Sequence, residues 1–501
     1  WLYNKTTLDT NLPPLFPPFL SSSPFILTYI CSKTTVLIIS RLLFEFHFDS
    51  QVLMVKDEES PAEDPMIIDN HLLPSSEDVV NPSNLKFYYA KLFPHADIFR
   101  WMSYGNDGKH PGCDKSFINR REFSFTLENE IYLRFLSFST LPELENSIKE
   151  KSPFKIDIGP VYTIDPSKRH AYTQTGDNVF APFERELIFD IDITDYDDVR
   201  YCCTGADVCS SCWPLMNVCI KVIDSSLRDD FGFEHILWVF SGRRGVHCWV
   251  CDKKARKLSN EQRSAVAEYF RVYKGSENNN KKMSLIGPAL HPFLTRSYTE
   301  FIKDFFETKW VSSQRLFEVE ERYERVLSMI PDESIQAELR GKWEVNKKSS
   351  EDINITRWEQ LKHSLQSGKH KAHGLRRSVE EIVFMFCYPR LDMEVTKHMN
   401  HLLKAPFCVH PKTGRVCVPI DPTSCDEFDP AHVPTASQVR IFNLMEYIGN
   451  VFKIQLVEEM NAAGVRGEND WEKTSVARAI WYFRKSFLEK LLKGCKVSLL
   501  N

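Results

Sequence analysis

The chain has 501 residues, of which 43% are hydrophobic and 26% are charged, so it is long enough for two or three globular domains and is not fibrous or wholly disordered. Its net charge of −5 at pH 7 excludes a general basic surface, so any contact with a polyanion has to come from local groups of basic residues. The 14 cysteines could form a secreted disulfide framework, but four of them lie within residues 202–212 and the rest are scattered. That distribution indicates a reducing compartment and one metal site.

The N-terminal region differs from the rest of the chain. Residues 1–53 do not begin with Met, and their apolar stretches at 24–31 and 35–40 are shorter than the roughly 18 apolar residues needed to span a membrane. We interpret them as leader sequence or a gene-model extension, with a targeting peptide as the alternative. Residues 54–83 are acidic and rich in Pro and Ser, which predicts a disordered tail.

From Asn84 onward the chain has the pattern of a folded protein. Apolar and aromatic residues at helical spacing predict helix within 85–104, and alternation over 121–138 predicts a hairpin that turns near Glu128 and Asn129. Further strands are predicted at 155–164, 186–194, 235–242 and 246–252, with a helix at 215–232 between two of them. Strands with interposed helices indicate a mixed α/β fold.

The rest of the chain divides by composition. Residues 259–380 are rich in Glu, Lys, Arg, Gln and Leu with few strand-forming runs, which predicts an inserted helical subdomain. The α/β pattern resumes afterwards and includes a hairpin around Pro411 and Gly414, and an amphipathic helix ends the chain. The predicted divisions are an extension at 1–83, a core at 84–258, a helical subdomain at 259–380, a second part of the core at 381–430 and a C-terminal helical segment at 431–501.

Three carboxylates are the first candidates for chemistry. In the strand ELIFDIDIT, Asp190 and Asp192 share a face because alternate side chains along a strand point the same way. Two neighbouring carboxylates repel each other unless a cation lies between them, and we expect Asp392, on another strand, to complete a site for two divalent ions. Such a pair of ions serves in-line displacement at phosphorus. The alternative is a solvated acidic strand end, which we expect for Asp195, Asp197 and Asp198.

The segment SGRRGVH at 241–247 follows an apolar strand and has the composition of a phosphate-binding turn. Arginines supply forked donors for phosphate oxygens, and glycines allow close approach of the backbone to a ligand. The spacing is not that of a Walker loop, and the alternative is a tight hairpin turn with exposed arginines. The residues expected to contact a triphosphate are Ser241, Gly242, Arg243, Arg244, Gly245 and His247.

Four thiols in eleven residues predict a structural zinc site. The final C-x-x-C has a usual zinc spacing, and a preceding pair of cysteines could close a tetrahedral site, although a neighbouring His could replace one of two adjacent cysteines. The predicted ligands are Cys202, Cys203, Cys209 and Cys212. A second C-x-x-C, Cys248 and Cys251, lies along a strand and is assigned to the core.

Basic residues follow Asp392 in the sequence. The segment HLLKAPFCVHPKTGR brings His401, Lys404, His410, Lys412 and Arg415 near that carboxylate, where they could neutralise a nucleotide triphosphate. The alternative is a solvated basic loop.

Taken together, these motifs resemble the catalytic small subunit of eukaryotic DNA primase, in the archaeo-eukaryotic primase superfamily. The resemblance rests on REFSFTL, KIDIG, FDIDITDYDDVR, CC-x5-C-x2-CW, SGRRGVHCWVCD, PRLD and HLLK-x-PF-x-VHPKTGR, and it runs from about Asn84 to the end of the chain. It implies an α/β primase catalytic core with a small zinc motif and a helical subdomain. It also implies synthesis of short RNA primers from NTPs on single-stranded DNA, in the nucleus.

The resemblance assigns roles to particular residues and names partners. Asp190, Asp192 and Asp392 would bind two Mg²⁺ or Mn²⁺ ions, and Glu122 would belong to the active site. The nucleotide would contact residues 241–247 together with Arg134, Lys155, Asp157, His401, Lys404 and His410. The implied partners are the large primase subunit, DNA polymerase alpha and its accessory subunit, the template and the RNA primer, with no membrane.

Three other functions remain open on the sequence. A repair-type primase-polymerase would polymerise deoxynucleotides with the same core. A non-catalytic zinc module would bind single-stranded DNA and would not need Asp190 or Asp392. A metallonuclease would use the same carboxylates but would have no need of SGRRGVH.

Overall fold

The computed structural model describes residues 82–171, 179–274, 282–283, 285, 289–345, 352–366, 375, 377–436 and 470–500. The interpretation of residues 1–53 as leader sequence lies outside these residues, as do 54–81 of the disordered tail predicted over 54–83 and 437–469 of the predicted C-terminal segment. Pro82 and Ser83, at the end of that predicted tail, are helical, which corrects the prediction for these two residues. Within the described part of the chain, no helix is both long enough and apolar enough to cross a membrane.

The core contains two antiparallel sheets, which position the candidate site. The first sheet has the order β10-β3-β1-β2, with β4 paired to β3, and the second has the order β11-β6-β7-β5. The strands of the first are β1 (Arg121–Thr126), β2 (Tyr132–Leu136), β3 (Lys155–Tyr162), β4 (Pro182–Glu184) and β10 (Leu403–Lys404). Those of the second are β5 (Leu187–Asp192), β6 (Ile236–Phe240), β7 (Gly245–Val250) and β11 (Pro419–Ile420). A short pair, β8 (Tyr273–Lys274) and β9 (Lys282–Met283), lies apart.

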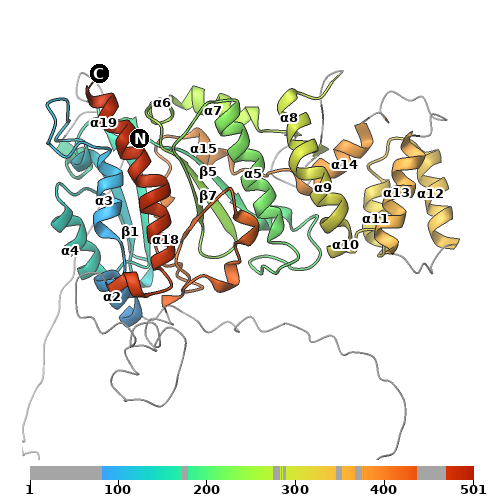
Figure 1. Ribbon diagram of the computed structural model, residues 1–501, viewed down its shortest axis with the longest axis horizontal. Coiled ribbons are helices and arrows are strands. Elements are labelled where there is room, and N and C mark those ends of the chain that lie inside the picture. The colour runs from blue at the N-terminus through green and yellow to red at the C-terminus, as the bar shows by residue number, and fades with distance from the viewer. Residues whose placement is uncertain are drawn as a thin grey trace, which may run out of the picture. The chain divides into compact units, whose positions relative to one another are not determined.

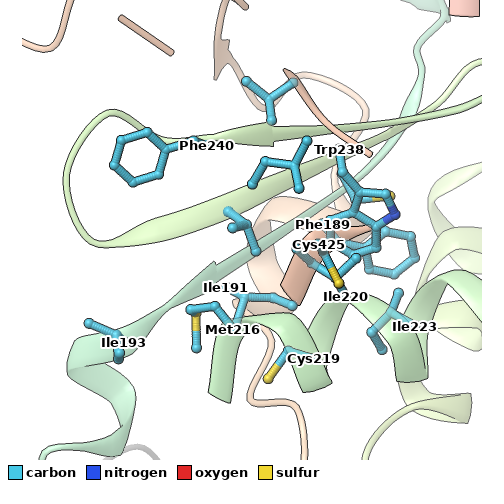
Figure 2. Packing of buried hydrophobic residues seen from close by; sticks show 14 of the residues in the cluster. Phe189, Ile191, Ile193, Met216, Cys219, Ile220, Ile223, Trp238, Phe240 and Cys425 are labelled. Carbon is cyan, nitrogen blue, oxygen red and sulfur yellow. The ribbon is translucent and has the colours of Figure 1, made fainter. Parts of the chain in front are cut away.

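Strand β5 packs one face against helix α5 (Pro214–Asp229). Phe189, Ile191 and Ile193 are fully buried and point toward the helix. They meet an apolar stripe of α5 formed by Met216, Cys219, Ile220 and Ile223, as Figure 2 shows. Because neighbouring strand residues alternate in direction, this packing sends Asp190 and Asp192 to the opposite face. The apolar side of the strand therefore fixes where its carboxylates point.

The two ends of the described chain lie side by side. Helices α2 (Pro82–Lys91), α3 (His95–Ser103) and α4 (Leu141–Lys151) come from the N-terminal side. The C-terminal helix runs through α18 (Ala477–Tyr482), the π-helical turn η11 (Phe483–Leu488) and α19 (Glu489–Leu500), and it lies beside α3 (Figure 1). Arg484 pairs with the buried Asp97, and the ring of Trp101 packs edge-on against Phe483. These contacts join α3 to the C-terminal helix.

Helices dominate residues 253–397. Helices α6 (Lys253–Arg256) and α7 (Asn260–Tyr269) follow β7, and a continuous helix over 292–313 contains α8 (Pro292–Ser297), η5 (Tyr298–Ile302), α9 (Lys303–Phe305), η6 (Phe306–Trp310) and α10 (Val311–Ser313). The remaining helices are α11 (Glu320–Leu327), α12 (Glu333–Val345), α13 (Ile353–Gln366), α14 (Ser378–Cys387) and α15 (Met393–Lys397). Trp343 and Trp358 are buried among them.

The structure confirms most of the predicted elements and corrects one. The 121–138 hairpin forms as β1 and β2, and the later hairpin closes through a bridge between Val409 and Val416. Asp392 was predicted on a strand, and that is wrong: it is the N-cap of helix α15, and its side chain accepts from the backbone N–H groups of Glu394 and Val395. A polar residue before a helix accepts from backbone N–H groups of the first turn, which have no partner within the helix.

Truncation of the buried face of β5 is expected to destabilise the protein. Ile191→Ala removes a fully buried side chain that faces α5, and loss of such a group costs about 2–5 kcal/mol of unfolding free energy. Urea denaturation of the full chain measures this cost. Val497→Ala, at a side chain that is 55% exposed, is the control and should change the midpoint little. Equal effects of the two substitutions would contradict the packing described for β5.

Candidate active site

The candidate site begins on paired strands β5 and β7. Asp190 lies opposite His247 in the pairing register, and Asp192 lies opposite Gly245. The Nε2 atom of His247 is 3.7 Å from Oδ1 of Asp190. Arg244 donates from Nε to Oδ2 of Asp192 at 2.7 Å. Each carboxylate of the strand thus faces a nitrogen-bearing side chain of the 241–247 segment.

Asp392 joins this cluster through the backbone. Its N–H donates to the carbonyl oxygen of Asp190 at 3.1 Å, which places the N-cap of α15 beside β5. Helix α15 also contacts α7 and β5. The third carboxylate therefore reaches the site although it comes from a helix end.

The electrostatics of the cluster favour a cation. Burial, together with the charges of Asp192 and Asp392, raises the pKa of Asp190 to about 7, and Lys404 offsets only part of this. Carboxylate oxygens are the ligands that Mg²⁺ and Mn²⁺ prefer, so the donor set fits these ions. The three carboxylates do not converge into one tight group: among the described residues, only the four-cysteine cluster places three or more potential ligand atoms within 4.8 Å of one another.

The turn at 241–244 owes its shape to contacts within the protein. Gly245 N–H donates to Oγ of Ser241 at 3.0 Å, and Ser241 N–H donates to the carbonyl of Gly245 at 2.9 Å. A Cβ on Gly245 would lie 2.3 Å from the carbonyl oxygen of Ile191. Gly242 has φ of +87°, and a Cβ there would lie 2.6 Å from Cβ of His410. Both glycines were expected to admit a ligand, but what approaches them closely here is the protein itself.

Basic side chains converge on this turn from the 404–415 segment. Lys404 donates from Nζ to the carbonyl of Ser241 at 3.0 Å, and Thr413 donates to the carbonyl of Gly242 at 2.6 Å. Burial lowers the pKa of His410 to about 2, assisted by the charges of Lys404, Arg243, Lys412 and Arg244. A neutral imidazole surrounded by four cations lies in a strongly positive environment, which favours an anion.

The imidazole of His247 is likewise buried and neutral. Burial and the charges of Lys404 and Lys155 lower its pKa to about 3, so the ring is neutral at physiological pH. Its Nδ1 atom is buried and has no hydrogen-bond partner among the described residues. A buried polar atom without a partner is costly, so a ligand that engages it would remove that cost.

The first sheet contributes a second row of polar groups. Asp157 is 1% exposed and lies 3.0 Å from Nζ of Lys155, and it is paired in register with Lys404 of β10. Burial raises the pKa of Asp157, while the charges of Lys155, Lys404 and His401 oppose that change. Burial lowers the pKa of His401, which lies between the charges of Asp392 and Asp157. Lys404 therefore links this row to the cluster on the second sheet.

Glu122 and Arg134 form a pair of their own. The carboxylate of Glu122 is fully buried and accepts from Nε of Arg134 at 2.9 Å, from the backbone N–H of Phe135 at 3.2 Å and from the hydroxyl of Tyr162 at 3.0 Å. These bonds use both carboxylate oxygens. In this arrangement Glu122 orients Arg134.

Sequence reasoning missed the buried ion network behind the site. Glu186 accepts from Arg121, Arg185 and the hydroxyl of Tyr104, all at 2.6–2.9 Å. Burial opposes ionisation of Glu186, but the two guanidinium groups hold its pKa well below the usual range. The triplet Glu184-Arg185-Glu186 before an apolar strand is the feature that could have indicated it, since charges at the start of a buried strand need partners.

The four cysteines form one cluster. The Sγ atoms of Cys202, Cys203, Cys209 and Cys212 all lie within 4.8 Å of one another. Those of Cys209 and Cys212 are 3.9 Å apart. A tetrahedral zinc ion with bonds of about 2.3 Å separates its sulfurs by about 3.8 Å, so the donors fit this ion. Cys248 and Cys251 are fully buried in the core, as expected.

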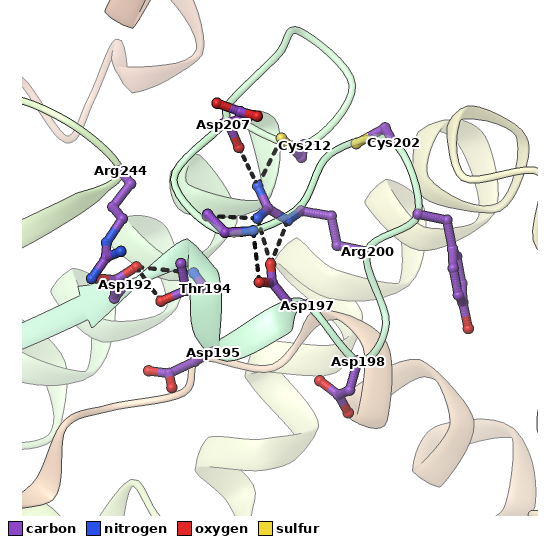
Figure 3. A network of polar contacts seen from close by, with 12 residues as sticks. Asp192, Thr194, Asp195, Asp197, Asp198, Arg200, Cys202, Asp207, Cys212 and Arg244 are labelled. Atoms are coloured by element: carbon purple, nitrogen blue, oxygen red, sulfur yellow. Dashed lines mark hydrogen bonds and ion pairs between the residues drawn. The ribbon is translucent and has the colours of Figure 1, made fainter. Parts of the chain in front are cut away.

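A buried arginine connects the cysteine cluster to the carboxylates (Figure 3). Arg200 pairs with Asp197, donates to the carbonyls of Gly205 and Asp207, and lies 3.6 Å from Sγ of Cys212. Asp197 belongs to the turn that follows β5, where Thr194 donates twice to Asp192. The cysteine loop and the site therefore share one polar network.

Asp197 is exposed to solvent, as expected, and Asp198 is partly exposed, but both carboxylates also form ion pairs that the sequence did not predict. Asp197 is paired with the buried Arg200, and Asp198 is paired with Arg390 and Arg325. The two partners of Asp198 are 192 and 127 residues away along the chain, so the local sequence could not reveal them. The acidic run stabilises tertiary contacts.

Comparison with known proteins identifies relatives along most of the chain. The family model described as DNA primase small subunit matches residues 189–422. The DNA primase small subunit of Drosophila melanogaster is 40% identical over 420 residues, covering 82% of this chain and 92% of that protein. Those of Schizosaccharomyces pombe and Saccharomyces cerevisiae are 38% and 36% identical, covering 75% of this chain and 81% and 93% of their own lengths.

Removing the charge of Asp190 is expected to stabilise the protein when divalent ions are depleted. Because the folded pKa is raised, the stability that protonation of Asp190 contributes is present at low pH and is lost as pH rises toward about 7. Asp190→Asn should therefore melt higher than wild type at pH 8, and the difference should be clearly smaller at pH 5, where folded Asp190 is protonated. Thermal melts at both pH values measure this, with Asp304→Asn at an exposed carboxylate as control.

Addition of Mg²⁺ or Mn²⁺ at pH 8 should raise the melting temperature of wild type and should leave Asp190→Asn nearly unchanged. A wild-type protein that is as stable as the variant at pH 8 without these ions would contradict the proposed repulsion.

Proposed function

The chain belongs to the DNA primase small subunit family, and from that premise we propose that it is the primase catalytic subunit, which joins NTPs into short RNA primers on a single-stranded DNA template to initiate DNA replication. One observation carries the proposal. A cluster of three carboxylates lies directly beside a group of positively charged side chains, and both are built on β5, β7 and the segments that dock on them. Nucleotidyl transfer needs these two environments next to each other.

In this proposal Asp190, Asp192 and Asp392 bind the catalytic Mg²⁺ or Mn²⁺ ions. Two such ions, when bound, polarise the attacking hydroxyl and neutralise charge at the reacting phosphorus. Arg244 is paired with Asp192 in the free protein, so it is placed to exchange that carboxylate for a phosphate oxygen. The raised pKa of Asp190 explains why the carboxylates need cations to ionise together.

The positively charged side chains would bind the triphosphate. Arg243, Arg244, Lys404 and Lys412 supply charge, and they stabilise the pyrophosphate as it leaves. His410 accepts from the backbone N–H of Lys412 at Nδ1, so the neutral ring carries its proton on Nε2 and can donate it to a phosphate oxygen. His247 offers its buried Nδ1, which has no partner among the described residues, to a ligand oxygen.

On the first sheet, we assign Lys155, Asp157 and His401 to the nucleotide and its ribose. The carboxylate of Asp157 is buried and lies against the amine of Lys155, and its oxygens retain capacity to accept from sugar hydroxyls. Arg134, oriented by Glu122, would contact the nucleotide from the edge of the sheet.

The cysteine cluster would bind one structural zinc ion. Four thiolates close a tetrahedral site and leave no open position, which favours a structural role over a catalytic one. We further propose that the chain acts with a large primase subunit, DNA polymerase alpha and its accessory subunit in the nucleus; the three relatives named above are each described as a small subunit.

Primer synthesis tests the catalytic proposal. The full chain is given poly(dT), labelled ATP and Mg²⁺ or Mn²⁺, without a primer. We expect oligoadenylate from wild type and a loss of at least about 10²-fold in Asp190→Ala, because that carboxylate supports the transition-state charge. Asp304→Ala, at an exposed carboxylate away from the cluster, is the matched control and should retain activity.

Other results would favour other functions. Extension of a supplied primer with dATP, without any synthesis from ATP, would favour a repair-type polymerase. Equal activity of wild type and Asp190→Ala would overturn the role of the carboxylates, and release of mononucleotides from DNA would indicate a nuclease.

Metal analysis of the purified chain tests the zinc site. We expect one zinc ion per wild-type chain and loss of that zinc, with a lower melting temperature, in Cys209→Ser, because three sulfurs no longer close the tetrahedron. Cys113→Ser is the control at a half-buried thiol outside the cluster. Full zinc content in Cys209→Ser would rule out the assignment.

A further inference from the structure

The edge strand β2 exposes side chains that neither the core nor the proposed nucleotide site uses. Ile131 and Tyr132 are 53% and 50% exposed, and they are two of only six exposed large hydrophobic residues in the described part of the chain. On the other face of the strand, Leu133 packs against the core. Ile131 precedes the strand, so Tyr132 is the exposed ring that β2 itself presents, and an exposed ring on an ordered strand indicates a contact surface.

The register of the first sheet places Tyr132 on the same face as the candidate site. Tyr132 lies opposite Thr126, and Thr126 lies opposite Lys155, so the three side chains form one row across β2, β1 and β3. With strands about 4.8 Å apart, Tyr132 is about 10 Å from Lys155 along this row. Lys155 in turn is close enough to His247 to lower the pKa of that ring. Tyr132 thus lies at the rim of the same polar face.

Basic groups flank the other end of β2. The 3₁₀ helix η3 (Pro166–Ala171) contacts β2, and its Arg169 lies with its guanidinium carbon 4.3 Å from the ring centre of Phe135. The guanidinium carbon of Arg134 lies 4.7 Å from the same ring. The side chain of Lys168 is 67% exposed, and Asp165 is 3.6 Å from its Nζ. We call the surface formed by Tyr132, Phe135, Lys168 and Arg169 the β2–η3 strip.

The strip has the composition of a surface that binds a single nucleic acid strand. Such surfaces combine an aromatic ring, on which a base stacks, with basic groups that follow the phosphates. The phosphate-contacting charge is at the η3 end, because Glu128 and Glu130 are exposed in the turn beside Tyr132. A stacking ring needs a base with a free face, and a paired duplex offers none along its length.

We propose that the β2–η3 strip binds the unpaired DNA template beside the nucleotide site, with Tyr132 stacking on a base and Lys168 and Arg169 contacting backbone phosphates. This inference rests on the proposed function for the identity of the strand, since the template is the unpaired polymer in that reaction. The strip lies on the edge strand of its sheet, so a strand bound there could continue past the protein in either direction.

Binding of single-stranded DNA to the full chain tests the proposal without any need for synthesis. The probe is fluorescently labelled oligo(dT), and its dissociation constant is measured by anisotropy over a range of salt concentrations. We expect Tyr132→Ala and Tyr132→Leu to weaken binding by about 5- to 100-fold, the cost of losing one stacked base, and Tyr132→Phe and Tyr132→Trp to bind like wild type. Trp481→Ala, at a 44% exposed ring on α18, is the matched control and should not change binding.

The role of Lys168 and Arg169 is tested separately, by the salt dependence of DNA binding. Lys168→Ala combined with Arg169→Ala should weaken binding at low salt and reduce the dependence of log K on log salt by about 1.4, since each phosphate that is no longer neutralised lowers the slope by about 0.7. Lys303→Ala combined with Lys309→Ala, at exposed lysines of the helical region, is the matched control and should leave the slope unchanged.

Steady-state synthesis separates this inference from its alternatives. The proposal requires a raised KM for the template and an unchanged KM for ATP in Tyr132→Ala. A raised KM for ATP with unchanged binding of oligo(dT) would overturn it and place the ring against the incoming nucleotide. Unchanged binding of oligo(dT) together with weakened binding of a protein partner would also overturn it. If wild type makes no primers and yet binds oligo(dT) through Tyr132, the strip is supported as a surface that binds single-stranded DNA. The proposed primase function would then be wrong.

Discussion

The two-sided environment of strand β5 is the constraint on which the rest of the site depends. Its apolar face is buried against α5, and burial of Ile191 and Phe189 fixes the direction of the strand's other side chains. Asp190 and Asp192 therefore share one face, and the backbone bond from Asp392 to Asp190 adds the third carboxylate. Burial and the neighbouring charges of Asp192 and Asp392 raise the pKa of Asp190, so the packing of the core maintains an unfavourable electrostatic interaction that cations would relieve.

Lys404 is the main link between the two sheets. It belongs to β10 of the first sheet, where it pairs in register with Asp157, and its amine donates to Ser241 in the turn between β6 and β7 of the second. Its charge acts on Asp190, Asp157, His247 and His410. The acidic cluster and the basic side chains can lie side by side because Lys404 reaches from one sheet to the other and partly neutralises the acidic side.

The cysteine cluster is connected by hydrogen bonds to the turn that follows β5. Arg200 joins Asp197, after β5, to carbonyls of the cysteine loop, and Gln314 from the helical region accepts from the backbone N–H groups of Tyr201 and Cys202. A metal in this cluster would fix the loop and, through Arg200, the turn that carries Thr194 and Asp192. The contribution of the cluster to activity would thus pass through the position of β5, although no cysteine lies among the carboxylates.

The sequence by itself determined the local elements, the shared face of Asp190 and Asp192 and the spacing of the cysteines, because strand alternation and ligand spacing are properties of short segments. It also carried the motifs that identify the family. Only the tertiary structure decided that Asp392 caps a helix, that Asp198 is paired with Arg325 and Arg390, that Gly242 makes room for His410, and that Tyr132 shares a face with Lys155. Each of these depends on partners in other elements, in most cases far along the chain, and such partners are chosen by the packing of whole elements, which no local pattern of residues encodes.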